Sequence, residues 1–339
     1  MATLLDGQVG HVREVTHGTP VTVTRFHEFN PGNAVKWDAG IQQSMPIRVG
    51  AIGDRADREY TSGGNGKGTF EAPLLSKGFG VWLESCFGTA TSTLVSGSTY
   101  QQLFTPGRTG TVRPAFTYQE GHPRTDGTVD AYTYAGCTVQ SFGLSQPMNE
   151  CVTLSTEIDA KSLATGTALA TATLPSAASL FEFDQAVVQY GGTLTPPTTT
   201  AVASMSGGTT STEMRSFEAT VNNNIDVDRW NMSTGLRSQP TFGKTEISLS
   251  AEMEYQSTTW RDAYINRTSN ALLITWTTTE ALSTGFATLQ IAVPVFRQTS
   301  PMPPDFTDGA TPTFTLEGKV FDNLTQMCYV VLRTSDSAL

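Results

Sequence analysis

Charged side chains, and basic ones above all, are scarce in this sequence of 339 residues. Asp, Glu, Lys and Arg make up 15% of it, and 31 acidic against 21 basic residues leave a formal net charge of −10 at pH 7. Ordinary domains hold roughly 25% charged residues. Because nucleic-acid binding depends on Lys and Arg that neutralise phosphates, this balance argues against a protein that holds DNA or RNA tightly.

Long apolar runs and cysteine pairs are missing as well. No stretch of about 18 apolar residues could span a bilayer, and residues 1–10 have neither the basic start nor the apolar run of an export signal. We therefore expect synthesis in the cytoplasm and no membrane insertion. The cysteines form no CxxC motif, which predicts reduced structural thiols. They are Cys86, Cys137, Cys151 and Cys328.

Motifs of catalysis and of metal binding are also missing. The four histidines have no HExxH spacing, and the GGNGKGT run at 63–69 lacks the Gly-Lys-Ser/Thr ending of a phosphate loop. Asp226 and Asp228 lack the Gly and distal Glu of an EF-hand, so they predict a turn. A glycoside hydrolase would need aromatic platforms beside paired carboxylates, but the five Trp are scattered. We predict no catalytic residue, cofactor or metal.

What the chain does contain is Thr and Ser throughout, with 31 Gly and 17 Pro, a composition that favours strands and turns. Residues 245–255 alternate strictly: Ile247, Leu249, Ala251 and Met253 point one way, and Glu246, Glu252 and Glu254 the other. Since side chains alternate along a strand, one face is core and the other is wet and negative.

Residues 152–161 predict a second strand of this kind, with Glu157 and Asp159 on its wet face. Further strands are expected at 115–119, 131–144, 271–279, 287–296, 313–321 and 327–333, separated by turn residues. Two short helices are expected at 76–87 and 257–265, where Trp, Leu or Tyr recur at helical spacing.

The order of these features predicts an internal duplication of strand, long loop, strand and helix, at 26–87 and again at 217–265. A second alignment, of 153–162 with 248–257, competes with it. We expect two similar β-sandwich subdomains, at 1–165 and 180–339. The uncharged Ala/Thr/Ser stretch at 166–179 would link them, and 191–212 would form a mobile Thr/Pro-rich loop.

Several segments, in this order, resemble the tail tube proteins of long-tailed, siphovirus-type bacteriophages. The opening HVREVTHGTPVTVTRFHEFNPGNAVKWDAGIQQSMPIRVG has the Gly-Thr-Pro turn and Phe-containing strand of that family, and GKGTFEAPLLSKGFGVWLESCFG its Gly-flanked strand and apolar helix. TYAGCTVQSFGLSQPMNECVTLSTEIDAKS, RSFEATVNNNIDVDRW and FTLEGKVFDN are similar to its later strands. Together the segments cover most of the chain, and their order carries the resemblance.

The resemblance implies an all-β sandwich or barrel that polymerises into stacked rings and forms the conduit for genome delivery. Partners would be further copies of itself, the tape measure protein and the tail-end proteins, with DNA passing transiently, and the chain would be located in the virion. If the halves repeat, three chains close a pseudo-sixfold ring; six single-domain chains are the alternative. Another virion β-sandwich, such as a decoration or baseplate module, is the alternative function.

Two sets of residues follow as expectations. Residues of the wet strand faces would line an acidic bore, past which DNA slides without sticking: Glu157, Asp159, Glu246, Glu252 and Glu254. The long loops at 44–65 and 227–241 would contact other subunits or rings, since both exceed what a hairpin needs. Arginines concentrate in those loops, where they could pair with carboxylates of a neighbour: Arg48, Arg55, Arg58, Arg229 and Arg237.

Overall fold

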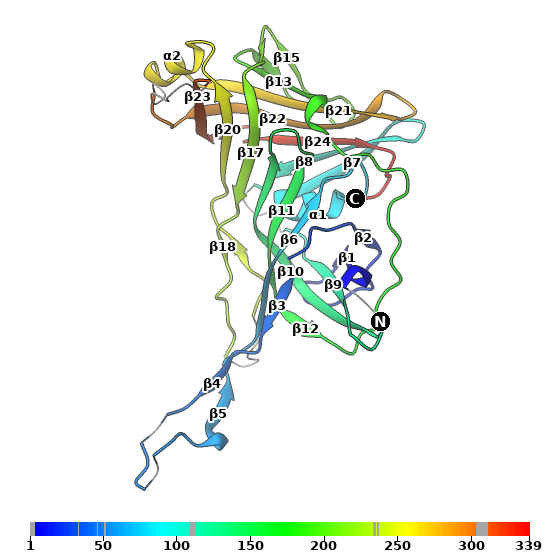
Figure 1. The fold of residues 1–339 in the computed structure, drawn as a ribbon, viewed down its shortest axis with the longest axis vertical. Helices are drawn as coiled ribbons and strands as arrows, with labels where there is room; N and C mark the ends of the chain where they lie inside the picture. Colours follow the sequence, from blue (N-terminus) through cyan, green and yellow to red (C-terminus); the bar gives the residue numbers. More distant parts are fainter. Residues whose placement is uncertain are drawn as a thin grey trace.

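The computed structural model describes residues 4–32, 34–45, 47–50, 52–108, 113–232, 235, 237–302 and 311–339. Figure 1 shows its elements in order. Residues 1–165, the first half, contain η1 (Leu4–Asp6), β1 (Gln8–Arg13), β2 (Arg25–His27), β3 (Val35–Asp38), β4 (Ile41–Gln43), η2 (Ala56–Arg58), β5 (Glu59–Thr61), β6 (Asn65–Pro73), α1 (Gly80–Phe87), β7 (Gly88–Ser96), β8 (Thr99–Pro106), β9 (Phe116–Pro123), β10 (Val129–Gln146), β11 (Thr153–Ala160) and β12 (Ser162–Ala164).

Residues 180–339, the second half, contain η3 (Phe183–Gln185), β13 (Ala186–Tyr190), β14 (Thr193–Thr195), β15 (Ser204–Ser206), β16 (Thr209–Thr210), β17 (Met214–Asn222), β18 (Ile225–Asp226), β19 (Thr241–Phe242), β20 (Glu246–Glu254), α2 (Thr259–Ile265), β21 (Asn270–Ala281), β22 (Phe286–Gln298), β23 (Thr313–Val320) and β24 (Tyr329–Thr334). The all-β prediction is confirmed, and every predicted strand range overlaps an observed strand.

One antiparallel sheet runs through both halves of the chain. Its strands pair in the order β3, β6, β11, β10, β17, β20, β23, and the β10–β17 pair joins the two halves directly. We call this the main sheet. The end of β22, at 296–298, pairs with the far side of β23. The division into two subdomains stays a prediction, and the sheet continues without a break across it.

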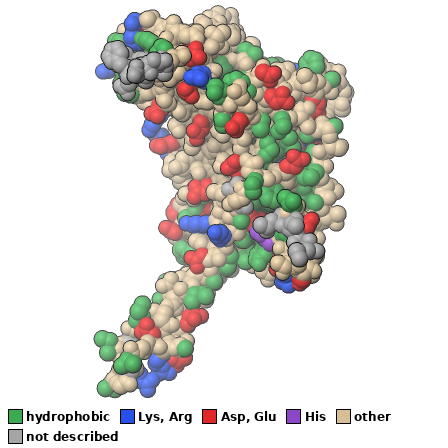
Figure 2. Space-filling model, viewed as in Figure 1, with side chains coloured by type: hydrophobic (Ala, Val, Ile, Leu, Met, Phe, Trp, Pro, Cys, Tyr) green, Lys and Arg blue, Asp and Glu red, His purple; other side chains and the backbone are tan. Residues whose placement is uncertain are grey.

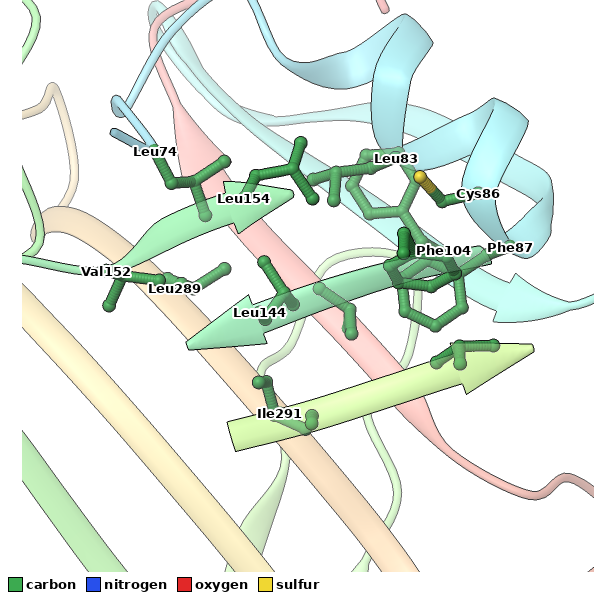
Figure 3. Packing of buried hydrophobic residues seen from close by; sticks show 14 of the residues in the cluster. Leu74, Leu83, Cys86, Phe87, Phe104, Leu144, Val152, Leu154, Leu289 and Ile291 are labelled. Carbon is green, nitrogen blue, oxygen red and sulfur yellow. The ribbon is translucent and has the colours of Figure 1, made fainter. Parts of the chain in front are cut away.

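A second layer crosses the main sheet at a steep angle (Figure 1), and the core lies between the two. This layer pairs β13, β21, β22, β24, β8 and β7 in order. In Figure 3, Leu144 and Leu154 from the main sheet face Leu289 and Ile291 from β22. All four are buried. Burying an aliphatic side chain of this size contributes about 1.5 to 3 kcal/mol, so the inner face of the main sheet stabilises the sandwich.

A further small sheet covers one side of the first half. It consists of β1, β2, β9, β12 and the early part of β10. The long strand β10 therefore passes from this sheet into the main sheet, with a register shift between Tyr134 and Cys137 where it leaves β9. Such irregularities bend a strand and allow it to belong to two layers.

Both predicted helices are present, but each begins later than expected, at Gly80 and Thr259. The expected start of α1 at Ser76 is wrong because that backbone is already committed: the Ser76 N–H donates to the Ser179 carbonyl at 2.9 Å. Helix α1 ends at Gly88, whose φ of +95° is a conformation that glycine adopts without steric cost. Trp82 on α1 and Trp260 on α2 are both buried and anchor the two helices.

Residues 165–182, apart from the isolated bridge of Leu180 to Leu75, form an irregular segment that crosses the first half. The loop expected at 191–212 instead contains the hairpin β14–β15, so its description as a loop is corrected. Ala203 packs with Leu273, Ala292 and Tyr329, and its N–H donates to Gln290. A row of Thr and Pro can pair as strands when a sheet lies beneath it.

The two halves share a detailed topological plan. Strand β3 pairs with β6, and β17 pairs with β20, each through a long connection that carries its own two-stranded ladder, β4–β5 or β18–β19. Each ladder begins three residues after its first strand ends and stops four residues before the next begins. A helix follows both β6 and β20. The first of the two predicted alignments matches this plan.

The turns that start the two connections agree at the level of single hydrogen bonds. The Asp38 side chain accepts from the N–H of Gly40, and the Asn222 side chain accepts from that of Asn224, both at 2.9 Å. Gly40 and Asn224 have positive φ, +63° and +44°. Their carbonyls in turn accept from Ser62 and Gly243. These matches support the predicted duplication.

Candidate assembly surfaces

The outer face of the main sheet is polar over its whole width, and acidic. Residues directly opposite on neighbouring strands share a face, so the register places Glu157, Ser141, Asn222 and Glu246 in one row. The next rows hold Ser, Thr and Gly between further carboxylates, which outnumber the two lysines on these strands, Lys67 and Lys319. On the inner side the alternate residues are buried, which is why the outer side is free to be polar.

Four of the five predicted bore residues lie on this outer face: Glu157, Glu246, Glu252 and Glu254. Glu252 is exposed and forms an ion pair with Arg215 at 3.3 Å. The register adds carboxylates from β6, β17 and β23 that sequence reasoning had not assigned, although their strands alternate in the same way: Glu71, Glu218 and Glu317. That the face lines a bore stays a proposal.

Asp159 differs from the other four, and its expected exposure is wrong. Only 2% of the residue is exposed, because the guanidinium of Arg237 covers it, with N–O distances of 3.0 and 2.9 Å. Arg237 is itself buried and also donates to the Ala160 carbonyl at 2.6 Å. Burial raises the pKa of Asp159, and the Arg237 charge opposes that rise. This arginine is therefore occupied within its own chain.

The connection between β3 and β6, residues 39–64, projects from the body as a long hairpin; we call it the arm (Figure 1). The predicted residues Arg48, Arg55 and Arg58 lie on it and are exposed, and Arg55 pairs with Asp57. Apolar side chains are exposed there too: Ile41, Met45, Ile47, Val49, Ile52 and Tyr60. Figure 2 shows apolar and basic side chains mixed at its tip. A cluster of exposed apolar side chains is typical of a surface that another protein covers.

The connection between β17 and β20, residues 223–245, lies against the body instead; we call it the second loop. Arg229 on it is exposed and donates to the Gln239 carbonyl at 2.6 Å. Trp230 packs on Gly63 at the root of the arm, where a Cβ would lie 2.4 Å from the indole. The Arg237 guanidinium lies over the same indole, 5.5 Å from its centre. The two long connections therefore meet at one end of the main sheet.

A cleft of about 1300 Å³ opens beside the second loop, at the end of the main sheet where β20 begins and β23 ends. Its walls are apolar in part, with Pro240, Phe242, Phe321 and Met327. Its charged residues are mostly basic: Arg108, Arg113, Arg229, Lys244 and Lys319, against Glu246 and Asp322. In a chain of net charge −10, this is a local concentration of positive charge.

Among the described residues, no three His, Cys, Asp or Glu side chains gather where they could hold a metal ion. No helix in that part of the chain has the length and apolar character needed to cross a bilayer. Burial raises the pKa of the Cys86, Cys137 and Cys328 thiols, which fits structural residues.

A continuous antiparallel sheet with one buried and one acidic face, with two long connections that meet at its end, defines the chain as a β-sandwich protein. The family model for phage tail tube proteins matches residues 5–320. The chain belongs to the phage tail tube protein family. No curated protein matches the chain.

Proposed function

We propose that this protein polymerises into stacked rings that form the tail tube of a siphovirus-type phage, the conduit for genome delivery. The observation that supports this most is the outer face of the main sheet, whose carboxylates come from β6, β11, β17, β20 and β23. An acidic wall repels phosphates, so DNA would pass along it without binding. A non-catalytic role in the virion, together with tape measure and tail-end proteins, belongs to the same proposal.

We infer further that three chains close each ring. Within the chain, β10 flanks β11 and pairs with β17, which flanks β20. The end of β22 pairs with β23 in the way that β10 pairs with β11, so it is the equivalent of β10 in the second half. Similarly, β3 pairs with β6 in the way that β17 pairs with β20, so β3 is the equivalent of β17. The same junction would therefore recur between chains, from the end of β22 to β3 of the next copy. Closed rings reuse one interface around an axis in this way, and they leave no exposed sheet edge.

Electron microscopy of the purified protein tests both statements. Hollow tubes or stacked rings with threefold order in end-on averages are expected. Isolated particles would contradict the tube function and favour a decoration or baseplate module. Strict sixfold order with one chain per unit would leave the tube function intact and contradict the three-chain ring.

A further inference from the structure

The second loop and the arm are equivalent segments of the topological plan, but they have different surroundings. Both connect paired strands through a two-stranded ladder and begin with the same turn at Asn222 and Asp38. The second loop packs on the first half of its own chain, whereas the arm extends away from the body (Figure 1). The surface that the second loop covers therefore indicates which equivalent surface an arm would cover.

That place is the loop end of the first half. Arg237 binds Asp159 and the Ala160 carbonyl at the end of β11, and Trp230 packs on Gly63 just before β6. The second loop thus covers the ends of the strands in the neighbouring half, next to the strand that pairs with its own root. The second loop therefore packs on the first half in the way that a loop of one subunit would pack on the neighbouring subunit of a ring.

The corresponding place on the second half is the cleft. In the pairing register, Asp159 lies opposite a position of β6 and Lys319 lies opposite the equivalent position of β20, so these two residues correspond. Counted back from the same two strands, Gly63 before β6 corresponds to Lys244 before β20. Lys244, Lys319, Val320 and Phe321 all line the cleft. Where the first half is covered by a loop from its own chain, the second half has an open space of about 1300 Å³.

The arm has the chemistry to fill this space. Ile47, Val49 and Ile52 are fully exposed near its tip, and the walls of the cleft include Phe242 and Phe321. The charges of the arm balance, with Asp54, Asp57 and Glu59 against Arg48, Arg55 and Arg58, so its apolar tip carries the argument; its carboxylates can face the mostly basic side chains of the cleft. Burial of apolar residues contributes most of the affinity of such a contact, and opposite charges orient it.

We propose that the arm of one copy docks in the basic, apolar-walled cleft of the preceding copy in the ring, the copy whose β22 would pair with its β3. This inference rests on the proposed function, because it requires chains that follow one another around an axis. The contact is heterologous, since arm and cleft are different surfaces, and each chain both donates an arm and receives one.

Complementary variants test the proposal without the need for a tube. Ile47→Ser with Val49→Ser and Ile52→Ser removes the apolar tip and leaves the cleft intact; Lys319→Glu with Phe321→Glu alters the cleft and leaves the arm intact. All five side chains are exposed, so both variants should fold. Each alone is expected to raise the concentration needed for polymerisation about 100-fold or more, since anchor residues dominate such contacts. Mixed, they are expected to form 1:1 pairs by light scattering.

Cross-linking in the parent assembly gives the position of the contact. Cysteines at Ile47 and Phe321, joined by a flexible bis-maleimide in a Cys151→Ser background, are expected to give covalent dimers and trimers on denaturing gels. The matched control places the second cysteine at Ile265, which is 66% exposed on α2 at the opposite end of β20, and should give monomers.

The outcomes separate the inference from the proposed function. Parent protein that forms tubes, but neither pairs in the mixture nor cross-links at Phe321, overturns the docking proposal and leaves the tube function standing. Parent protein that forms no rings or tubes overturns the proposed function. Cross-links at Ile265 equal to those at Phe321 also overturn the docking proposal, because they place the arm elsewhere.

Discussion

Helix α1 buries all eight of its residues, whereas α2, which follows the equivalent strand in the second half, buries Trp260 alone. The small sheet of β1, β2 and β9 adds a layer beside α1, as the contact of His11 with Trp82 shows, with tilted rings whose centres are 4.9 Å apart. For the two long connections the difference is reversed: the second loop, from the second half, packs against the body, whereas the arm, from the first half, extends away from it. Equivalent segments of the two halves therefore differ in burial because different parts of the chain surround them.

The largest expected effect comes from the two anchoring tryptophans. Trp82→Ala and Trp260→Ala should each lower the free energy of unfolding by about 3 to 5 kcal/mol, as large buried aromatics do. Trp82 should lie at the upper end, because it stacks on Phe70 at 4.5 Å and also contacts Phe116. Urea denaturation measures this, with Tyr264→Ala on exposed α2 surface as a control of small effect. Equal, small losses at both tryptophans would contradict the burial.

Breaking the buried ion pair should release the second loop. Asp159→Asn leaves the buried Arg237 charge without its partner, and removing one member of such a pair costs about 3 to 5 kcal/mol. The double variant Asp159→Asn with Arg237→Met should recover much of that loss, since no unpaired charge remains. Arg229→Ala, on the exposed part of the same loop, is the matched control. Unfolding in urea of the parent, of Asp159→Asn, of Arg237→Met and of the double variant gives the four free energies of the cycle, and additive losses would contradict the coupling.

Acid should destabilise the first half in particular, because all four histidines lie there. His11 and His27 are buried against each other, with 2.9 Å between Nδ1 and Nε2. Burial, the largest cause, lowers the pKa of His27 from 6.5 to about 3 and that of His11 well below 6.5. The unfolded chain therefore binds more protons between pH 6.5 and 3, so stability is full above pH 6.5 and is lost as the pH falls through this window.

The expected slope is about 1.4 kcal/mol per pH unit for each such histidine. Urea midpoints between pH 7 and 4 measure it, and His27→Leu should flatten the slope. His122→Gln is the control, because the hydrogen bond to Glu120 raises the pKa of His122, so its contribution to stability is constant below pH 6.5 and is lost only as the pH rises above that value. A parent protein whose midpoint does not change between pH 7 and 4 would contradict the buried, neutral pair.

The smallest effect on stability is expected on the acidic face. Glu252→Lys with Glu254→Lys should change the free energy of unfolding by roughly 0.5 kcal/mol or less, since both lie on the polar side of β20. If that face lines the bore, tubes of this variant should eject DNA more slowly, most clearly at low salt. Glu28→Lys with Asp184→Lys, two exposed residues outside the main sheet, makes the same change in net charge and is the control. Unchanged ejection by the double variant would contradict a bore position.

The sequence by itself determined the fold class and the strands whose alternation is strict. Ile247, Leu249, Ala251 and Met253 are all buried because a period of two admits only one core-facing set. Trp82 and Trp260 marked both helices for a similar reason. The hairpin of β7 and β8 was missed, since its Ser and Thr carry little apolar contrast, and its reversal depends on Gly97 at φ +56°.

Only the tertiary structure decided which polar residues stay in water. Asp159 and Glu157 alternate identically along β11, yet Arg237, 78 positions away, covers the first and leaves the second accessible. The residue that covers the end of β11 comes from a loop that is distant in the sequence, so the pattern of residues along β11 cannot reveal it. The cleft has the same origin: its walls come from four segments between residues 106 and 327, and they form a basic site only because folding brings them together.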